Sequence, residues 1–205
     1  MFSGGMDSTA TAARYLQNGY SVLLVTFDNG AQRGLDEPRA KAELIAKKYK
    51  GRCEWKLLEC VFLFHEIAIE NLEEDIKKFG NLVCCGCKLA MLSEAIIYCK
   101  KHEIKTIADG FEKGQIYYPE QTPEYIAVAD DFAGQFGINY LHPIYEMNAG
   151  QIENLVRNAG LPLEPKQSTC LFGLNRVSNK NIEEYTRSKL NIARHHIENA
   201  LIKGG

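Results

Sequence analysis

The sequence predicts an α/β protein with a doubly wound parallel sheet and helices on both faces. Short apolar runs rich in β-branched residues alternate with longer stretches of helical periodicity, which is typical of βαβ units. The first apolar run, residues 21–27, has no polar alternation, as expected of a central strand that is covered on both faces. In such sheets ligands bind at the carboxyl ends of the strands, so the turn residues there are the first candidates for function.

Turn residues and helix signals divide the chain into elements. Asp28-Asn29-Gly30 ends the first strand, Gly51 stops the helix before the second strand, and Pro123 occupies a tolerated first helical position. In chain order, we expect strands at 21–27, 53–59, 105–108 and 140–143. We expect helices at 7–18, 36–49, 87–102, 123–136, 149–159 and 181–201, and a helix followed by a loop within 61–83.

Length and composition suit one domain that spans residues 1–205, with 165–205 as a C-terminal helical extension. The chain is 45% hydrophobic and 24% charged. No apolar run reaches the roughly 18 residues of a membrane span, and we expect neither a membrane segment nor a signal peptide. Seven cysteines without a secretory context indicate a reduced, cytoplasmic protein.

The start of the chain is unusual. Only Met1 and Phe2 precede the first glycine-rich loop, where this kind of fold places a strand. We therefore expect that the first strand is missing, because a truncated or mis-started sequence explains this more simply than a novel fold.

That first loop is the strongest functional signal. Ser3-Gly4-Gly5-Met6-Asp7-Ser8 leads directly into a helical pattern, and its two glycines let the backbone approach a ligand closely. Backbone N–H groups and the positive end of the helix dipole make such a junction a site for phosphate or pyrophosphate, and the hydroxyls of Ser3 and Ser8 add donors. The alternative is a glycine turn with an Asp/Ser cap and no ligand. No Gly-Lys-Ser/Thr follows, so this is not a Walker loop.

A second candidate lies where the first expected strand ends, at residues 26–30. This position borders the nucleotide in a doubly wound sheet, so groups around Phe27 are candidates to contact adenine or ribose. A simple turn at the end of the strand is equally compatible with the sequence.

The cysteines are the third signal. Cys84 and Cys87 form a C-x-x-C pair just before an expected helix, and Cys170 stands far along the chain. Three converging thiolates can hold an iron–sulfur cluster with one open iron, bind zinc, or run persulfide chemistry. The alternative is that they are small buried side chains. Cys53, Cys60 and Cys99 fall within strand or helix patterns and are expected in the core.

The net charge of −2 gives no basic excess of the kind that nucleic-acid binding usually needs. Basic residues do gather late in the chain, and a solvated helix face explains them better than a nucleic-acid patch. His195-His196 lies in a helical pattern, where adjacent residues face different directions, so a metal pair is not expected. The late basic residues are Lys166, Arg176, Lys180, Arg187, Lys189 and Arg194.

The S-G-G-x-D-S loop resembles the PP-loop of the N-type ATP pyrophosphatases, whose fold is the adenine nucleotide alpha hydrolase type. Those enzymes split ATP into AMP and pyrophosphate and leave AMP on the substrate. The resemblance implies that ATP and Mg²⁺ are bound here by Ser3, Gly4, Gly5, Asp7 and Ser8. Asp7 would contribute to the metal or pyrophosphate environment.

Cys84-x-x-Cys87-Lys88, with a later Cys170-Leu171, resembles PP-loop sulfur-transfer enzymes such as the tRNA thiouridine synthetases. In that group a sulfur on cysteine or on a cluster displaces AMP from the adenylated substrate. The resemblance implies that Cys84, Cys87 and Cys170 are catalytic residues, either as ligands of a [4Fe-4S] cluster or zinc, or as sulfur carriers. It also implies that Asp109 and Gly110 lie near the bound substrate.

Three other segments are similar to the cyano-deazaguanine synthases of queuosine biosynthesis, and together they cover most of the chain. Those enzymes adenylate a carboxylate and let ammonia attack, giving first an amide and then a nitrile. They have a four-cysteine zinc site near the C-terminus, where this chain has only Cys170, and that difference weakens the nitrile assignment. The similar segments are residues 26–33, 118–126 and 143–170.

We therefore expect an ATP pyrophosphatase that adenylates a carbonyl or carboxyl oxygen and delivers sulfur to it, in tRNA base modification. The expected partners are a sulfur donor and either tRNA, met through another protein, or a small nucleobase-like substrate. A homodimer is the candidate oligomeric state. The alternatives are amidation of a small precursor, as in the cyano-deazaguanine synthases, and a non-catalytic ATP-binding subunit of a modification complex.

Overall fold

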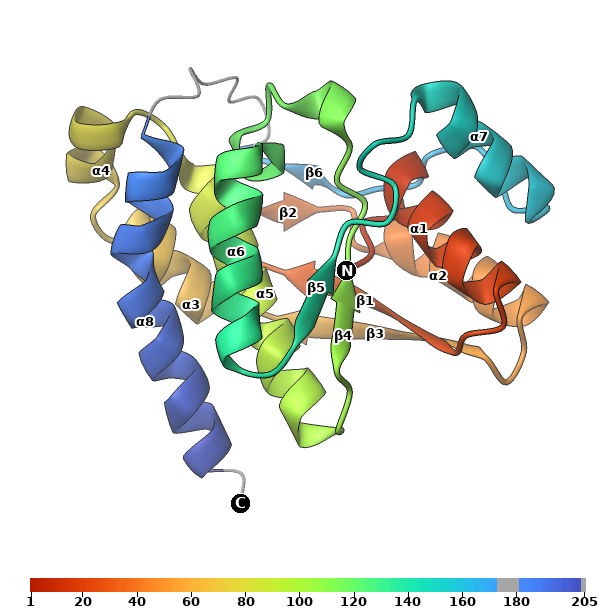
Figure 1. Cartoon of the computed structure of the whole chain (residues 1–205), viewed down its shortest axis with the longest axis horizontal. Coiled ribbons are helices and arrows are strands. Elements are labelled where there is room, and N and C mark those ends of the chain that lie inside the picture. Colours follow the sequence, from red (N-terminus) through yellow and green to blue (C-terminus); the bar gives the residue numbers. More distant parts are fainter. Residues whose placement is uncertain (173–180, 204–205) are drawn as a thin grey trace. The chain divides into compact units, whose positions relative to one another are not determined.

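The computed structural model describes residues 1–172 and 181–203, and shows a mixed α/β protein with parallel strands (Figure 1). Its residues group into two compact units, each assembled from three separate stretches of chain. Unit 1 comprises residues 1–58, 108–114 and 142–170, and unit 2 comprises residues 59–107, 115–141 and 171–205.

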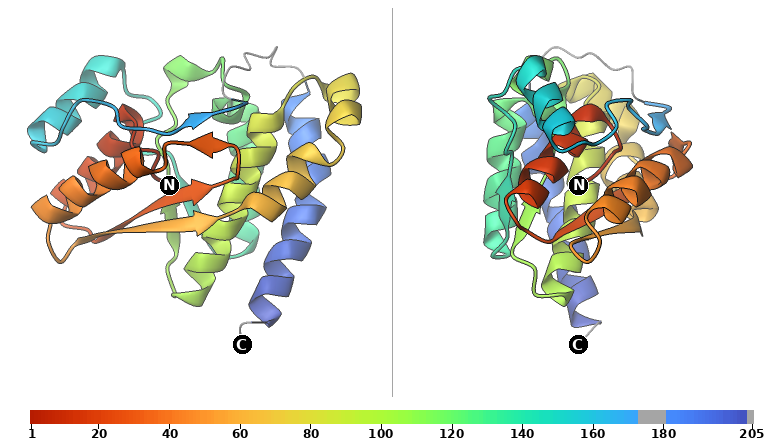
Figure 2. Two further views of the ribbon diagram at one scale, coloured as in Figure 1. Left: turned by 180° about the vertical axis from the view of Figure 1, so that it is seen from behind. Right: turned by 90° about the vertical axis from the view of Figure 1, so that its right-hand side faces the viewer.

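Unit 1 contains the first strands and helices of the chain together with α7 from its later part. Strand β1 (Val22–Asp28) pairs with β3 (Cys53–Glu59), and the two run in the same direction (Figure 2). Helices α1 (Met6–Gln17), α2 (Asp36–Lys48) and α7 (Ala149–Asn158) complete the unit. Their apolar faces meet in one core that includes Ala10, Leu16, Leu24, Ile45, Ile144 and Val156, all almost fully buried. These bounds confirm the expected helices and strands within one or two residues.

The sequence gives no signal for one small sheet in unit 1. Strand β2 (Gln32–Arg33) pairs antiparallel with β6 (Thr169–Cys170), and Gln32 lies opposite Cys170. Two-residue strands show no periodicity, and their partners are far apart in the chain, so a local pattern does not reveal them. Residues 165–170, expected at the start of a helical extension, are therefore not helical.

The two residues before the glycine-rich loop are hydrogen-bonded as part of a strand would be. The N–H of Phe2 donates to the carbonyl of Val25 in β1 (2.7 Å), and the Thr26 hydroxyl donates to the carbonyl of Phe2 (2.9 Å). The terminal ammonium of Met1 donates to the carbonyl of Ala108. Together with the burial of the Phe2 side chain, these bonds fix where the loop begins.

Unit 2 is built mainly from helices. The long helices α5 (Val83–Lys101) and α8 (Ile182–Ile202) pack against each other, and α6 (Pro123–Gln135) contacts both. Strand β4 (Thr106–Ala108) pairs with β5 (Asn139–Leu141). The last residue of β4, Ala108, belongs to unit 1. Short helical turns η2 (Lys113–Gln115) and η3 (Pro119–Gln121) precede α6.

The region 61–83 differs from the expected helix and loop. It contains α3 (Val61–Phe64), a π-helical turn η1 (His65–Ile69) and α4 (Leu72–Phe79), and α4 ends at Gly80. Helix α5 then begins at Val83, four residues earlier than expected. Cys84 therefore lies inside the first turn rather than before the helix, and Cys87 lies one turn into the helix rather than at its start.

Gly86 explains why the start of α5 is hidden in the sequence. A Cβ at Gly86 would lie 2.7 Å from the Tyr185 hydroxyl and 2.8 Å from the Ala68 Cβ. Glycine therefore serves close packing between helices here, although in a sequence it favours a turn. Among the described residues, no single helix is long and apolar enough to cross a membrane, although the bent pair α4 and α5 passes a test of length and composition.

Candidate active site

The glycine-rich loop lies at the start of α1 in unit 1. Gly4 has φ +79°, and a Cβ there would lie 1.8 Å from the Lys166 carbonyl oxygen and 2.9 Å from the Pro38 Cα. Only glycine fits this backbone. Gly5 is extended (φ −69°, ψ 172°) and forms the N-cap of α1 without a side-chain cap. The first N–H groups of an α-helix have no partner within the helix, so this junction offers donors to an anion.

Two serines fix the shape of the loop. The Oγ atoms of Ser3 and Ser8 lie 3.2 Å apart, and the Gly5 N–H donates to Ser3 Oγ (3.4 Å). The Thr9 hydroxyl donates to the Gly5 carbonyl (2.7 Å). Ser8 is buried whereas Ser3 is exposed, so Ser3 presents a hydroxyl at the surface and Ser8 holds it from beneath. Asp7 adds a half-buried carboxylate in the first helical turn.

Residues 164–167 cover this loop, and sequence patterns do not indicate that contact. The Lys166 N–H donates to the Gly4 carbonyl (3.1 Å), and the Gln167 side-chain oxygen lies 2.5 Å from where a Cβ of Gly5 would be. The fully buried Lys41 of α2 donates to the Glu164 carbonyl (2.9 Å). Burial lowers the pKa of Lys41, while Glu164 acts in the opposite direction. This segment brings Lys166 beside the loop.

The structure also brings Asp109 and Gly110 to the loop. A Cβ at Gly110 would lie 2.6 Å from the Ser8 backbone nitrogen, and the Thr11 hydroxyl donates to the Asp109 carbonyl (2.8 Å). The turn after β4 is therefore packed on the first turns of α1. Nucleotide contact by Asp109 and Gly110 stays a prediction, but their place beside the loop agrees with it.

Asp109 holds a histidine that sequence patterns do not single out. His142 Nδ1 lies 2.9 Å from Asp109 Oδ1, and the two side chains are 10% and 1% exposed. The Phe111 ring stacks on the imidazole (5.3 Å, 12°), and its N–H donates to Asp109 Oδ1 (3.1 Å). The only sequence feature that could have indicated a functional role for His142 is its position directly after β5, at the carboxyl end of a strand.

The end of β1 is an internally bonded turn. Asp28 Oδ1 accepts from the Gly30 N–H (2.8 Å), and Asn29 Oδ1 accepts from the Ala31 N–H (2.9 Å). Phe27 is buried in the core, and its contact with a nucleotide stays a prediction. The sequence is compatible with a simple turn and with a nucleotide-binding segment. The hydrogen bonds show that the segment is a turn, and they do not test nucleotide binding.

The structure does not gather Cys84, Cys87 and Cys170 within one unit. Cys170 lies in β6 of unit 1, and the other two lie at the start of α5 in unit 2. Among residues 1–172 and 181–203, no group of three or more His, Cys, Asp or Glu side chains is arranged to hold a metal ion. The three-cysteine site therefore stays a prediction. None of the seven cysteines forms a disulfide in this part of the chain.

The other cysteines are buried thiols. Cys53, Cys60 and Cys99 belong to the core, as expected from their strand and helix patterns. Burial raises the pKa of Cys53 and of Cys99 to about 11. Burial also raises the pKa of Cys85, and the nearby Glu120 adds to the effect. Such thiols are poor nucleophiles near neutral pH.

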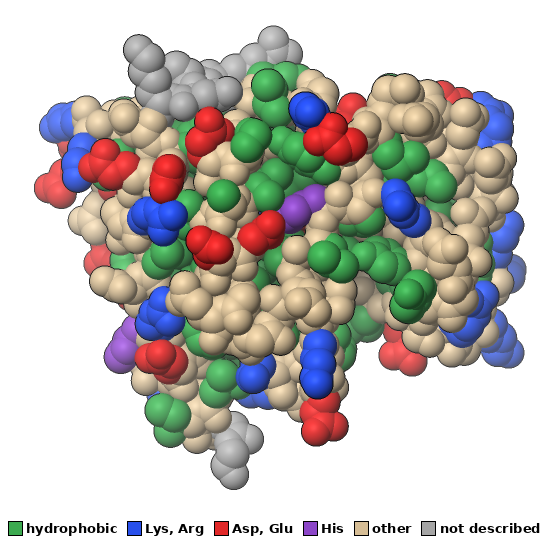
Figure 3. Space-filling view, viewed as in Figure 1, with side chains coloured by type: hydrophobic (Ala, Val, Ile, Leu, Met, Phe, Trp, Pro, Cys, Tyr) green, Lys and Arg blue, Asp and Glu red, His purple; other side chains and the backbone are tan. Residues whose placement is uncertain are grey.

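The late basic residues are mostly bonded within the fold. Lys189 is buried and pairs with Asp75 (2.5 Å), contrary to the solvated face expected for it, while Arg187 pairs with Glu183 on the same helix. Arg194 donates to Gln135, and Arg176 and Lys180 lie outside the described residues. Figure 3 shows acidic side chains gathered over α6, whose charged residues are Glu124, Asp130 and Asp131.

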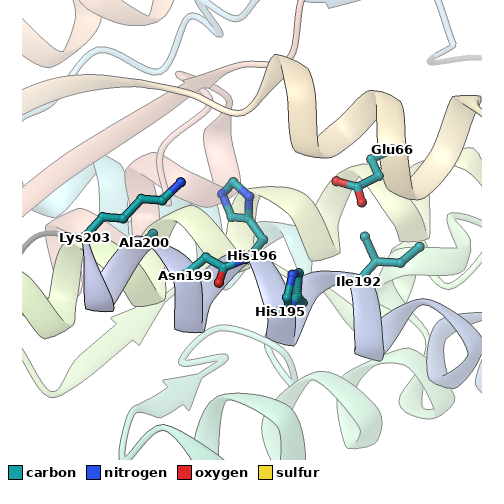
Figure 4. A pocket seen from close by; sticks show the side chains of 7 residues that line it. All are labelled: Glu66, Ile192, His195, His196, Asn199, Ala200 and Lys203. Atoms are coloured by element: carbon teal, nitrogen blue, oxygen red, sulfur yellow. The ribbon is translucent and has the colours of Figure 1, made fainter.

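Unit 2 has a cavity of about 320 Å³ beside α8. Figure 4 shows Glu66, from η1, facing the α8 side chains that line the cavity, including His195 and His196. His196 Nε2 lies 2.7 Å from Glu94 Oε1, and this hydrogen bond raises the pKa of His196.

Comparisons with known proteins found a matching family model, a similar protein and a similar fold. The model of the family described as "Queuosine biosynthesis protein QueC" matches residues 1–179. A 7-cyano-7-deazaguanine synthase of Pseudoalteromonas translucida is 23% identical over 194 residues, covering 88% of this chain and 86% of that protein. A predicted subunit of a tRNA methyltransferase from Methanocaldococcus jannaschii has a similar fold, with a TM-score of 0.52 and 17% identity over 83% of this chain and 94% of that one.

Proposed function

The chain belongs to the QueC family of PP-loop proteins, and on that premise we propose that it uses ATP to convert the carboxylate of a deazaguanine-like base to an amide and then a nitrile. The observation that carries the proposal is the geometry of the loop from Ser3 to Ser8, within a family match that covers residues 1–179. The relative from Pseudoalteromonas translucida, named for a 7-cyano-7-deazaguanine product, supplies the substrate class.

The first step activates a poor electrophile. A carboxylate oxygen attacks the α-phosphorus of ATP, pyrophosphate leaves, and an acyl adenylate remains. The backbone donors at the start of α1 would bind the leaving pyrophosphate, because they are already oriented and need no rearrangement as charge develops. The backbone N–H of Lys166 donates to the Gly4 carbonyl and holds the loop in this shape. Mg²⁺ would arrive with ATP and neutralise pyrophosphate charge, and Asp7 is the loop's own carboxylate.

The second step brings nitrogen to the activated carbon. Ammonia forms the C–N bond, AMP leaves with the electron pair of the C–O bond, and the nitrogen loses a proton. A second ATP would activate the amide oxygen in the same way, and loss of AMP and a proton would leave the nitrile. The sequence is compatible with this amidation as an alternative to sulfur transfer. The comparisons favour amidation over sulfur transfer.

The four-cysteine zinc site that the resemblance implies does not fit this chain. Cys170 is the only cysteine in the corresponding region, and none follows it. In the structure its strand partner is Gln32 rather than a thiol. We therefore assign no step to zinc. The proposed substrate is a free base in a reducing, cytoplasmic setting, and neither a sulfur donor nor tRNA is part of the proposal.

The test is turnover with the carboxylate that corresponds to that nitrile, 7-carboxy-7-deazaguanine. Wild-type protein with ATP, Mg²⁺ and ammonium should release AMP and pyrophosphate and give products whose mass shows the amide and the nitrile. Asp7→Asn should lower pyrophosphate release at least about 100-fold, in the range for loss of one preorganised electrostatic group. The matched control is Asp131→Asn on the exposed surface of α6, which should keep the wild-type rate.

Two outcomes would contradict the proposal. The first is wild-type protein that binds ATP and releases no AMP with this base. The second is iron and acid-labile sulfide in anaerobically purified protein that disappear in Cys170→Ala, because a cluster on Cys170 would restore sulfur transfer as the function.

A further inference from the structure

Lys41 is a charged residue on the buried face of α2, and it is 0% exposed. Burying an ammonium costs free energy, and an apolar residue would fill the same position without that cost. A charged group on an otherwise apolar face therefore points to a role for the ammonium itself. The buried residues of this helix are Pro38, Lys41, Ala42 and Ile45.

The ammonium of Lys41 is bonded to the segment that covers the PP-loop. Its Nζ donates to the carbonyl of Glu164 (2.9 Å). Two residues later, the N–H of Lys166 donates to the carbonyl of Gly4 (3.1 Å). The Cα of Pro38, one turn before Lys41 on α2, lies 2.9 Å from where a Cβ of Gly4 would be. The helix, the segment that covers the loop and the loop itself are therefore in contact, all within unit 1.

A second lysine of α2 makes the same kind of bond at the surface. Lys48, two turns after Lys41, is exposed and donates to the carbonyl of Gly160 (3.0 Å). The two ammonium groups thus hold residues 160–164 along α2. One of them is buried and bonded two residues before the contact with Gly4, and the other is solvated. The chain therefore contains its own control for the buried bond.

We infer that Lys41 is a positioning residue for ATP. Its buried ammonium holds residues 164–167, the covering segment, on the PP-loop, and this keeps the loop in the shape that receives the phosphates. The inference rests on the proposed function, because it takes the loop as the ATP site. Lys41 acts through the Glu164 carbonyl rather than by contact with the nucleotide. Without the ammonium, the covering segment opens, and the apparent ATP affinity falls with the fraction of molecules that are closed.

The test compares Lys41→Met, which removes the ammonium and keeps a long side chain, with Lys48→Met. In Lys41→Met, the affinity for ATP in calorimetric titration should fall at least about tenfold, because the Glu164 carbonyl loses its donor. Exchange of the Lys166 amide hydrogen, followed by NMR, should become at least about tenfold faster. Lys48→Met should stay within about threefold of wild type in both measurements, because its bond is solvated. Wild-type ATP affinity in a folded Lys41→Met variant would overturn the inference.

The dependence of rate on ATP separates positioning from a loss of folded protein. With 7-carboxy-7-deazaguanine, Lys41→Met should need at least about tenfold more ATP for half-maximal AMP release, and its rate at saturating ATP should stay within about threefold of wild type. Saturating ATP should also slow exchange of the Lys166 amide again, because coupling between two sites is reciprocal. A lower maximal rate with an unchanged ATP requirement would show a smaller folded fraction and would overturn the inference.

A second variant covers the case in which Lys41→Met does not fold. Pro165→Gly lies on the exposed surface of the covering segment and leaves Lys41 unchanged, but it raises the entropy cost of holding the segment in place. Its ATP affinity should fall about two- to fivefold, and wild-type affinity would overturn the inference. Wild-type protein that binds ATP and releases no AMP with this base would instead refute the proposed function, and the ATP affinities would still decide the role of Lys41.

Discussion

Gly4 shows how one residue type can be required by a contact rather than by a turn. Its φ of +79° disfavours any side chain, and the Lys166 carbonyl fills the space that a Cβ would occupy. Gly19 has almost the same dihedral (φ +86°) but nothing lies within 4 Å of where its Cβ would be. The two glycines therefore separate the cost of the backbone conformation from the cost of the close approach.

Gly4→Ala should abolish detectable ATP binding, because the loop and residues 164–167 cannot keep their positions around a new methyl group. Gly19→Ala should retain wild-type affinity and lose only about 1 kcal/mol of unfolding free energy through its positive φ. Calorimetric titration measures the ATP affinity of each variant, and urea unfolding measures the free energy of unfolding. Equal ATP affinity in the two variants would show that the contact with Lys166 is unimportant.

Helices α4 and α8 are joined by two ion pairs in different environments. Asp75 and Lys189 pair at 2.5 Å with side chains that are 13% and 7% exposed. Glu184 and Lys78 pair at 3.4 Å, and both are well exposed. Burial decides the difference, since a buried charge that loses its partner keeps its desolvation cost, while an exposed one is simply solvated.

Asp75→Asn should therefore lower the free energy of unfolding by about 3 to 5 kcal/mol, because it leaves Lys189 buried without its counter-charge. The matched change at the exposed pair, Glu184→Gln, should cost less than about 1 kcal/mol. Both substitutions replace a carboxylate by an amide of the same shape. Urea unfolding measures them, and similar losses for the two variants would contradict the argument from burial.

At the scale of the whole molecule, stability should respond to pH through His196. Its hydrogen bond to Glu94 joins α8 to α5 and raises its pKa in the folded state above the value of about 6.5 in an unfolded chain. Burial opposes this shift, and Glu66 supports it. The protonated form is therefore favoured by folding, so its contribution is fully present below about pH 6.5 and is lost as pH rises through the folded pKa.

His196→Gln should remove the decrease in unfolding free energy that accompanies rising pH. The wild-type protein should become less stable between about pH 6.5 and pH 8, and the variant should show a flatter profile over that window. His195→Gln, one residue away and without the bond to Glu94, should follow the wild-type profile. Urea unfolding at several pH values checks this, and a wild-type stability that rises over the window with His196 intact would contradict it.

Local signals predicted much of this molecule, and pairing over long chain distances accounts for the rest. The bounds of β3 and the start of α2 at Asp36 follow from periodicity and turn residues that act over a few positions. The β2–β6 pairing and the contact of Lys166 with Gly4 depend on residues far apart in the chain. Gly86 favours a turn when only the local sequence is considered, but glycine is required there by close packing against a neighbouring helix.

Some residues of the candidate site can likewise be recognised from local sequence, and others only from the fold. The loop from Ser3 to Ser8 is recognisable because all its parts are consecutive, and Asp109-Gly110 follows a short expected strand. His142 has no local motif, and its significance appears only when the fold places it on Asp109. The three cysteines show the opposite case, in which a motif in the sequence is not gathered within one unit.

The contact between Lys166 and Gly4 also has a consequence for the order of events during synthesis. The phosphate loop is translated well before the residues that cover it, which are among the last parts of unit 1 in chain order. A nascent chain that stops before residue 164 has the S-G-G-x-D-S letters without the surface that shapes them. Nucleotide capture should thus begin only after residues 164–167 have been translated and have packed on the loop.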